Sequence, residues 1–210
     1  MCETYTSEHL QTIKTQFPAM YKNLQVPTVE VIGDTRHVSP IALQGLFDAR
    51  GVSVDTSKDS EFVGKNSVAL VSDAIAGFDT SVGTKLKYGG SREAFVRVGD
   101  DGKTKCVVDE RGVLCGSCES LGETFLRLVN EFEMSLHAAS RLCSLNPARI
   151  ARLSHLIGSL EVGKRGDLVF IDRGDSEKKK NEKFRIAGCV VGGVVLHHIS
   201  SRPPHHYSYS

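Results

Sequence analysis

Four consecutive apolar residues, Val68 to Val71, end on a serine and an aspartate, Ser72 and Asp73. A run of this length predicts a strand that is buried on both faces, as the strands of parallel sheets are. In a barrel of parallel strands, the residues that carry out chemistry follow the carboxyl ends of the strands. Asp73 is therefore a candidate functional carboxylate, although an acid in this place can also do no more than cap the next helix.

A second strand is predicted upstream, over Thr28 to Gly33, and polar residues that include Asp34 and His37 follow it. Ser39 to Arg50 predicts a helix, because it has a serine cap, a proline in the first turn and apolar residues at helical spacing. The order strand, helix, strand predicts a parallel β/α unit. Since parallel strands end at the same edge of a sheet, we expect His37 and Asp73 to share one pocket.

The rest of the chain alternates between short strands and helices. Residues 81–113 carry short alternating segments broken by glycines, which predict β-hairpins. Amphipathic helices are predicted over Ser120 to Phe132 and Ser135 to Cys143, and Asn146 with Pro147 predicts the cap and first turn of a third. Further strands are predicted over Asp167 to Asp172, Arg185 to Val191 and Gly193 to His198.

Charge and hydropathy argue against two classes of partner. The 210 residues carry a net charge of +1, and the basic residues are scattered, so no electrostatic footprint for nucleic acid is present. The longest apolar run, Ala187 to Leu196, is too short to span a bilayer, and the amino terminus lacks the basic flank and apolar core of a signal peptide. We therefore expect a cytoplasmic protein without nucleic-acid or membrane partners.

Cys115 and Cys118, two of the six cysteines, form a C-x-x-C pair. A zinc site would need two more soft ligands at a comparable spacing, and none is nearby. A redox function would need the pair at the start of a helix that follows a strand, which this segment roughly offers. The redox hypothesis therefore stays open at this point.

Five segments carry a resemblance to a known family: Val31-Ile-Gly-Asp-Thr-Arg-His-Val-Ser-Pro40, Val71-Ser-Asp-Ala74, Leu114-Cys-Gly-Ser117, Ser144-Leu-Asn-Pro-Ala-Arg149 and the segment 158–172. In this order they resemble the C-terminal half of the amidohydrolase superfamily. The last two are shared by many amidohydrolases. The first three are similar to the N-acetylglucosamine-6-phosphate deacetylase family, and the resemblance covers about residues 28–198.

The resemblance implies an α/β fold, in which the C-terminal part of a metal-dependent amidohydrolase β/α barrel (a TIM barrel) is followed by return strands of a small β-domain. It divides the chain into a poorly assigned segment 1–27, a partial barrel over 28–157, strands of the small β-domain over 158–199 and a disordered tail over 200–210. In that family the β-domain is built from both ends of a longer chain. We therefore expect this chain to correspond to about half of such an enzyme.

The activity that the resemblance implies is hydrolysis of N-acetyl-D-glucosamine 6-phosphate to D-glucosamine 6-phosphate and acetate, a carbon–nitrogen hydrolase reaction of amino-sugar metabolism. Asp73 would be the catalytic acid/base that carries a proton from the attacking water to the leaving amine. The residues that would bind the substrate are Asp34, Thr35, Arg36, His37, Leu114, Cys115 and Gly116. The partners implied are the phosphorylated amino sugar and a second copy of the chain in a homodimer.

The sequence departs from the family pattern at the metal site. The family binds a divalent metal ion, zinc or similar, through a glutamate and two histidines on earlier strands. His9 is a candidate for one of these ligands, but its spacing is several residues short, and the other two have no counterpart. Thr35 also replaces a family glycine. We therefore expect the isolated chain to hold far less than one metal ion and to be inactive on its own.

Two alternatives remain open. The chain could be a catalytically inactive, truncated homologue that acts as a binding or assembly module, or an amidohydrolase for another, cyclic amide. The residues also permit simpler roles, since His37 could be a loop histidine with a satisfied hydrogen bond and Asp34 could only cap a turn. A structure with His37 and Asp73 at opposite ends of the sheet would rule out a shared site.

Overall fold

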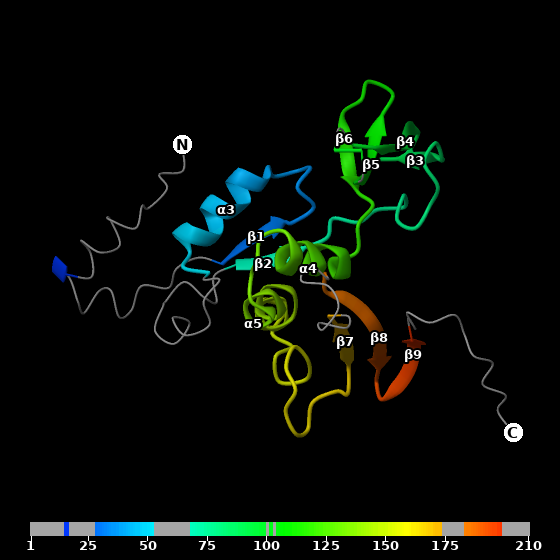
Figure 1. The fold of residues 1–210 in the computed structure, drawn as a ribbon. Coiled ribbons are helices and arrows are strands. Elements are labelled where there is room, and N and C mark those ends of the chain that lie inside the picture. Colours follow the sequence, from blue (N-terminus) through cyan, green and yellow to red (C-terminus); the bar gives the residue numbers. More distant parts are fainter. Residues whose placement is uncertain are drawn as a thin grey trace, which may run out of the picture.

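The computed structural model describes residues 15–16, 28–52, 68–99, 101–102, 104–173 and 183–198. Strand β1 (Val29–Ile32), helix α3 (Pro40–Ala49) and strand β2 (Val68–Val71) form the unit that positions the site (Figure 1). The two strands pair in parallel, with Val29 opposite Val68 and Ile32 opposite Val71. Ser39 caps α3, since its hydroxyl accepts a hydrogen bond from the Ala42 amide. The predicted strand–helix–strand unit is thus confirmed.

The larger hydrophobic core lies between this unit and the helices that follow it. Phe47 and Leu43 of α3 are buried against β1 and β2, together with Leu128 and Leu142 from later helices. The ring of Phe47 meets that of Phe132 edge-on at 6.1 Å between centroids, a favoured aromatic geometry. This packing holds the two parallel strands against the helices.

Residues 81–113 form β-hairpins, as the alternating pattern predicts. Strands β3 (Lys85–Tyr88), β4 (Arg92–Val98), β5 (Lys105–Asp109) and β6 (Leu114–Ser117) make an antiparallel sheet in sequence order. Its own small core contains Ala94, Val96, Val107 and Cys118. This sheet stands to one side of the β1–β2 pair (Figure 1). A backbone bridge between Ala74 and Ser117 joins the two.

Helix α4 (Leu121–Asn130) starts in a capping box formed by Ser120 and Glu123, at the place that the sequence predicts. Helix α5 (Leu136–Ser140) runs through a π-helical turn, η3 (Arg141–Leu145), into α6 (Asn146–Ile150). Because Pro147 cannot donate a backbone hydrogen bond and its ring crowds the preceding turn, the widened turn lets the helix pass through the proline.

The prediction that Asn146 caps a new helix is wrong. Asn146 is itself helical and buried, and its side-chain amide donates a hydrogen bond of 2.7 Å to the carbonyl of Val68 in β2. A local capping pattern cannot distinguish a cap from an amide that reaches a strand 78 residues away in the chain. Asn146 therefore ties the helical layer to the strand that carries the site.

The last sheet contains β7 (Leu168–Asp172), β8 (Arg185–Val191) and β9 (Val194–His198), which are antiparallel and lie close to their predicted ranges. Asn130 of α4 fastens it to the helices through two hydrogen bonds with the backbone of Phe184. Among the described residues, β1 and β2 are the parallel strands, so the part of the chain seen here contains one β/α repeat. Over the same residues, no helix has the length and apolar character needed to cross a membrane.

Candidate active site

The carboxyl ends of β1 and β2 bring His37 and Asp73 together. Asp73 follows β2 after one residue, and His37 lies in the turn between β1 and α3. The Nε2 atom of His37 is 3.2 Å from Oδ2 of Asp73. The predicted arrangement, parallel neighbouring strands with these two side chains on one rim, is confirmed.

Asp34 holds the imidazole in place from the other side. Its carboxylate is almost fully buried, at 1% exposure, and Oδ2 lies 2.8 Å from Nδ1 of His37. Its Oδ1 accepts hydrogen bonds from the backbone amides of Arg36, at 2.9 Å, and His37, at 3.0 Å. The simpler role of Asp34 as a turn cap is correct, but the same carboxylate also orients the His37 ring.

We call Asp34, His37 and Asp73 the relay. Nε2 of His37 and Oδ2 of Asp73, 3.2 Å apart, form an ion pair when the ring is protonated. The side chains of His37 and Asp73 are 20% and 40% exposed, so the outer end of the relay meets solvent while Asp34 is buried. A carboxylate beside an imidazole at an accessible edge is an arrangement suited to general acid–base chemistry.

Two residues of the site adopt a left-handed backbone conformation. Thr35 has a φ of 63° and Asp73 a φ of 50°. Aspartate tolerates this region, whereas a β-branched residue there is a genuine outlier. The Thr35 hydroxyl donates a 2.6 Å hydrogen bond to the Asp34 carbonyl, which offsets part of the strain. Strain of this kind, held by the surrounding structure, is typical of functional sites.

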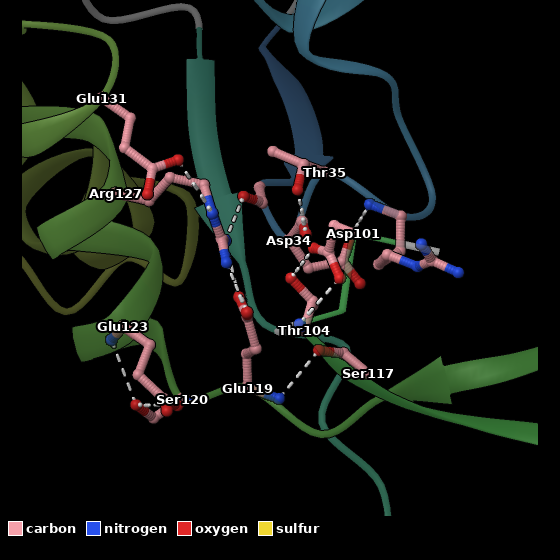
Figure 2. Close-up of polar contacts among 12 residues, drawn as sticks. Asp34, Thr35, Asp101, Thr104, Ser117, Glu119, Ser120, Glu123, Arg127 and Glu131 are labelled. Atoms are coloured by element: carbon pink, nitrogen blue, oxygen red, sulfur yellow. Dashed lines mark hydrogen bonds and ion pairs between the residues drawn. The ribbon is translucent and has the colours of Figure 1, made fainter. Parts of the chain in front are cut away.

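The side chain of Arg36 lies against the tip of the β4–β5 hairpin, in the space that a side chain on Gly99 would occupy. At the same tip, Thr104 donates its hydroxyl hydrogen bond to Asp101. Figure 2 shows Asp101 and Thr104 next to Asp34 and Thr35. The hairpin tip is therefore a neighbour of the predicted substrate-binding turn.

The segment Leu114, Cys115 and Gly116 forms β6 and does not begin a helix, which removes the arrangement that the redox hypothesis needs. Its end reaches the site through backbone hydrogen bonds, because the Ser117 amide donates to the carbonyl of Asp73 at 3.0 Å. A Cβ on Gly116 would lie 2.8 Å from the Ile75 side chain. Close packing against Ile75 leaves no room for a side chain at this position.

One pair of buried charges at the site has no counterpart among the sequence predictions. Arg127 of α4 forms a bidentate ion pair with Glu119, with a distance of 2.6 Å from Nη1 to Oε2, and it also donates to the Gly33 carbonyl at 3.2 Å (Figure 2). The two side chains are 12% and 9% exposed. Glu119 precedes the helix and Arg127 lies in its last turn, where a basic residue is usually solvated, so no sequence pattern marks this pair.

Burial affects the pKa of both Glu119 and Arg127. It raises the pKa of the Glu119 carboxyl, because the hydrogen bonds and charge of Arg127 offset the loss of solvent only in part. Burial alone would lower the pKa of the Arg127 guanidinium, but the hydrogen bonds and charge of Glu119, with smaller effects of Glu131 and Asp34, raise it. Arg127 therefore stays charged beside the inner end of the relay.

The described residues do not fit a metal ion on their own. A catalytic zinc site takes three protein ligands, whereas the described residues contain no group of three or more His, Cys, Asp or Glu side chains that could hold one. At the relay, the atoms that could face an ion are Nε2 of His37 and the Asp73 carboxylate, and these contact each other. The candidate ligand His9 lies outside the described residues.

Comparison with known families identifies the class of protein. The model of the amidohydrolase family matches residues 49–196, more than half of the chain, and the chain belongs to this family. Asp73 lies within the matched range, whereas Asp34 and His37 precede it. Comparison with curated protein sequences gives no match.

Three solved structures similar to this chain are N-acetylglucosamine-6-phosphate deacetylases. The enzyme from Pasteurella multocida is 22% identical with a TM-score of 0.60, over 83% of this chain and 38% of the enzyme. The enzyme from Thermotoga maritima is 19% identical with a TM-score of 0.60, over 83% of this chain and 40% of the enzyme. A D267A mutant from Mycobacterium smegmatis in complex with N-acetyl-D-glucosamine-6-phosphate is 22% identical with a TM-score of 0.59, over 80% and 37%. The chain thus shares their fold and spans about two fifths of their length.

Proposed function

We propose that this chain carries the proton-transfer half of a deacetylase site that hydrolyses N-acetylglucosamine 6-phosphate to glucosamine 6-phosphate and acetate. The observation that carries the proposal is the 3.2 Å contact between His37 and Asp73 at the carboxyl edge of paired parallel strands, with Asp34 behind the ring. Membership of a family of amide hydrolases supports the reaction class. The similar solved structures and the motifs around Asp34, Asp73 and Leu114 support the substrate.

Asp73 is the acid/base of the proposed reaction. Water attacks the carbonyl carbon of the acetamido group, and the Asp73 carboxylate accepts the proton that this water loses. The same carboxyl then gives the proton to the leaving nitrogen, so that the carbon–nitrogen bond breaks as acetate forms. His37, oriented by Asp34, donates from Nε2 to Asp73 or to the substrate oxygen and keeps the carboxylate aligned.

The neighbouring residues would bind the sugar phosphate. Thr35 and Arg36 lie between Asp34 and His37 in the sequence, so the turn that they form is beside the relay. The guanidinium of Arg36 is the positive charge in this turn. Arginine suits a phosphate because its planar group offers paired donors. Leu114, Cys115 and Gly116 of β6, whose last residue Ser117 bonds the Asp73 backbone, would line the substrate pocket. A homodimer and a divalent metal ion held by residues outside the described set also belong to this proposal.

Acetate release tests the proposal. The 210-residue chain, and a chimera in which residues 28–198 replace the matched segment of the Pasteurella multocida enzyme, are assayed with N-acetylglucosamine 6-phosphate and with N-acetylglucosamine. We expect the chimera to release acetate from the phosphorylated sugar and the Asp73→Asn chimera to be nearly inactive. A chimera that folds, binds metal and releases no acetate would contradict the proposal and favour the inactive binding module.

A further inference from the structure

Hydrogen bonds and ion pairs around the relay form a closed ring. The ring passes from the Asp73 carbonyl to the Ser117 amide, at 3.0 Å, and from the Ser117 hydroxyl to the Glu119 amide, at 2.9 Å. From Glu119 it continues through Arg127 to the Gly33 carbonyl at the end of β1. Asp34, the next residue, contacts His37, and His37 returns to Asp73. Both ends of the His37–Asp73 contact are thus fixed through the same ring.

The ring joins segments that are distant in the chain. Gly33 and Arg127 are 94 residues apart, and their hydrogen bond joins β1 to α4. A Cβ on Gly33 would lie 2.5 Å from a methyl group of Thr124, so the glycine allows α4 to approach close enough for Arg127 to reach the carbonyl. Figure 2 shows Arg127 between Glu119 and the end of β1, on the inner side of Asp34.

The Glu119–Arg127 ion pair carries a desolvation cost that needs an explanation. Burying two charges removes their hydration, and a well-packed apolar pair of the same size is often as stable or more stable. Here Arg127 donates to the carbonyl of Gly33, the residue directly before Asp34, as well as to Glu119. The pair is therefore placed where it acts on the relay, and not only between α4 and its neighbours.

We propose that the Glu119–Arg127 ion pair is a positioning device for the relay, with Arg127 as the positioning residue that fixes the carboxyl end of β1 and thereby the Asp34–His37 contact. The expected effect of the ion pair on turnover rests on the proposed function. Its expected effect on the position of His37 does not. Groups that face Arg127 are Glu119, Glu131 and Asp34, and those that face Glu119 are Arg127, Glu123 and Asp34.

Three variants of the full 210-residue chain separate positioning from simple stability. Arg127→Lys keeps a cation beside Glu119 but loses the planar fork that bonds both carboxylate oxygens and Gly33 together. The double change Glu119→Leu with Arg127→Met removes both buried charges. Glu131→Gln is the matched control, because it removes the exposed partner of Arg127, which is 4.0 Å away, and leaves Glu119 and Gly33 in place.

Two readouts are taken for each variant: the urea midpoint, and the proton NMR signal of the hydrogen-bonded His37 ring N–H, assigned with His37→Gln. We expect Arg127→Lys to keep most of the stability but to exchange the His37 ring proton at least tenfold faster. The double variant should unfold at a urea midpoint close to that of wild type, because it leaves no buried charge unpaired, but it should not keep the protected ring proton. In the chimera that releases acetate, both sets of changes should lower kcat about tenfold or more, as small misplacements of catalytic groups do.

The proposal would be overturned if the His37 ring proton exchanged as slowly in Arg127→Lys and in the double variant as in wild type. The ion pair would then be a structural contact only. If the double variant fails to fold, the comparison of ring-proton exchange in Arg127→Lys and Glu131→Gln decides whether the proposal holds. Absence of acetate release from the chimera with the wild-type segment would count against the proposed function only, because the NMR readout does not depend on substrate. A changed ring proton in Glu131→Gln would also contradict the proposal, since that residue does not belong to the ring.

Discussion

The imidazole of His37 stands between two carboxylates, with Nδ1 at 2.8 Å from Oδ2 of Asp34 and Nε2 at 3.2 Å from Oδ2 of Asp73. One carboxylate is buried and the other reaches solvent, so the two contacts are not equivalent. The buried carboxylate fixes the ring, whereas the exposed one is accessible to a bound molecule. This asymmetry is the physical basis for assigning positioning to Asp34 and proton transfer to Asp73.

Asp73→Asn tests the proton-transfer role. The amide keeps the size of the side chain but cannot accept and return a proton, so kcat for acetate release in the chimera should fall about 10²–10⁴-fold. Metal content should change little. Asp79→Asn is the matched control, because Asp79 is also exposed with a positive φ, of 57°, and lies outside the site. Activity of Asp73→Asn within a few-fold of wild type would make Asp73 structural.

Metal content tests whether the chain supplies enough ligands to hold a metal ion. Because the described residues supply His37 and Asp73 but no third ligand, we expect the purified 210-residue chain to hold far less than one zinc ion after dialysis. We also expect no measurable acetate release from it. Elemental analysis by mass spectrometry measures the first and an enzymatic acetate assay the second. One metal per chain, lost on His9→Ala, would instead show that residues outside the described set complete a site.

Thr35→Asn tests the backbone strain beside the relay. Asparagine tolerates a φ of 63° better than a β-branched residue and does not add the unfolded-state entropy of glycine. Urea unfolding should show a gain of about 0.5–1 kcal/mol in the free energy of unfolding, after loss of the local hydroxyl hydrogen bond. Thr35→Val keeps the branch and loses the hydroxyl, so it should be destabilised. Equal stability of both variants would show that the turn is not strained.

Alkaline pH tests the burial of Cys143 in the π-helical turn. Burial raises the pKa of this thiol to about 12 from an ordinary value of 9.0. Since the folded value lies above the unfolded one, the stabilising contribution is complete below about pH 9 and is lost as the pH rises towards 12. Between pH 9 and 10, wild type should lose about 1 kcal/mol more than Cys143→Ala, measured by urea unfolding. Parallel losses in the two proteins would contradict the raised pKa.

Local patterns predict most elements of this chain because each element meets a local physical requirement. Ser39 before Pro40 satisfies the first amides of α3, and Ser120 with Glu123 does the same for α4, so both helix starts can be placed from sequence. Pairs of short alternating strands around glycine turns predict the hairpins between residues 81 and 113. The contact of His37 with Asp73 follows as well, since parallel strands in register must end side by side.

Other features depend on contacts that no local pattern contains. Asn146 has the sequence context of a helix cap, yet its amide bonds β2, because the strand passes the helix at that point. No local pattern shows that the Ile75 side chain fills the space beside Gly116. Glu119 precedes α4 and Arg127 lies in its last turn, where charged side chains are usually solvated, yet the two pair with each other and Arg127 bonds the Gly33 carbonyl after β1.

The sequence by itself determined the order of strands and helices, the β/α unit that carries the site and the residues Asp34, His37 and Asp73 at its edge, because periodicity and capping are encoded within a few residues. The tertiary structure decided which carboxylate is buried, how the hairpin sheet joins Asp73 through Ser117, and that an ion pair from α4 closes the ring around the relay. Burial and close approach depend on which elements pack together, and the packing partners here come from segments up to 94 residues apart.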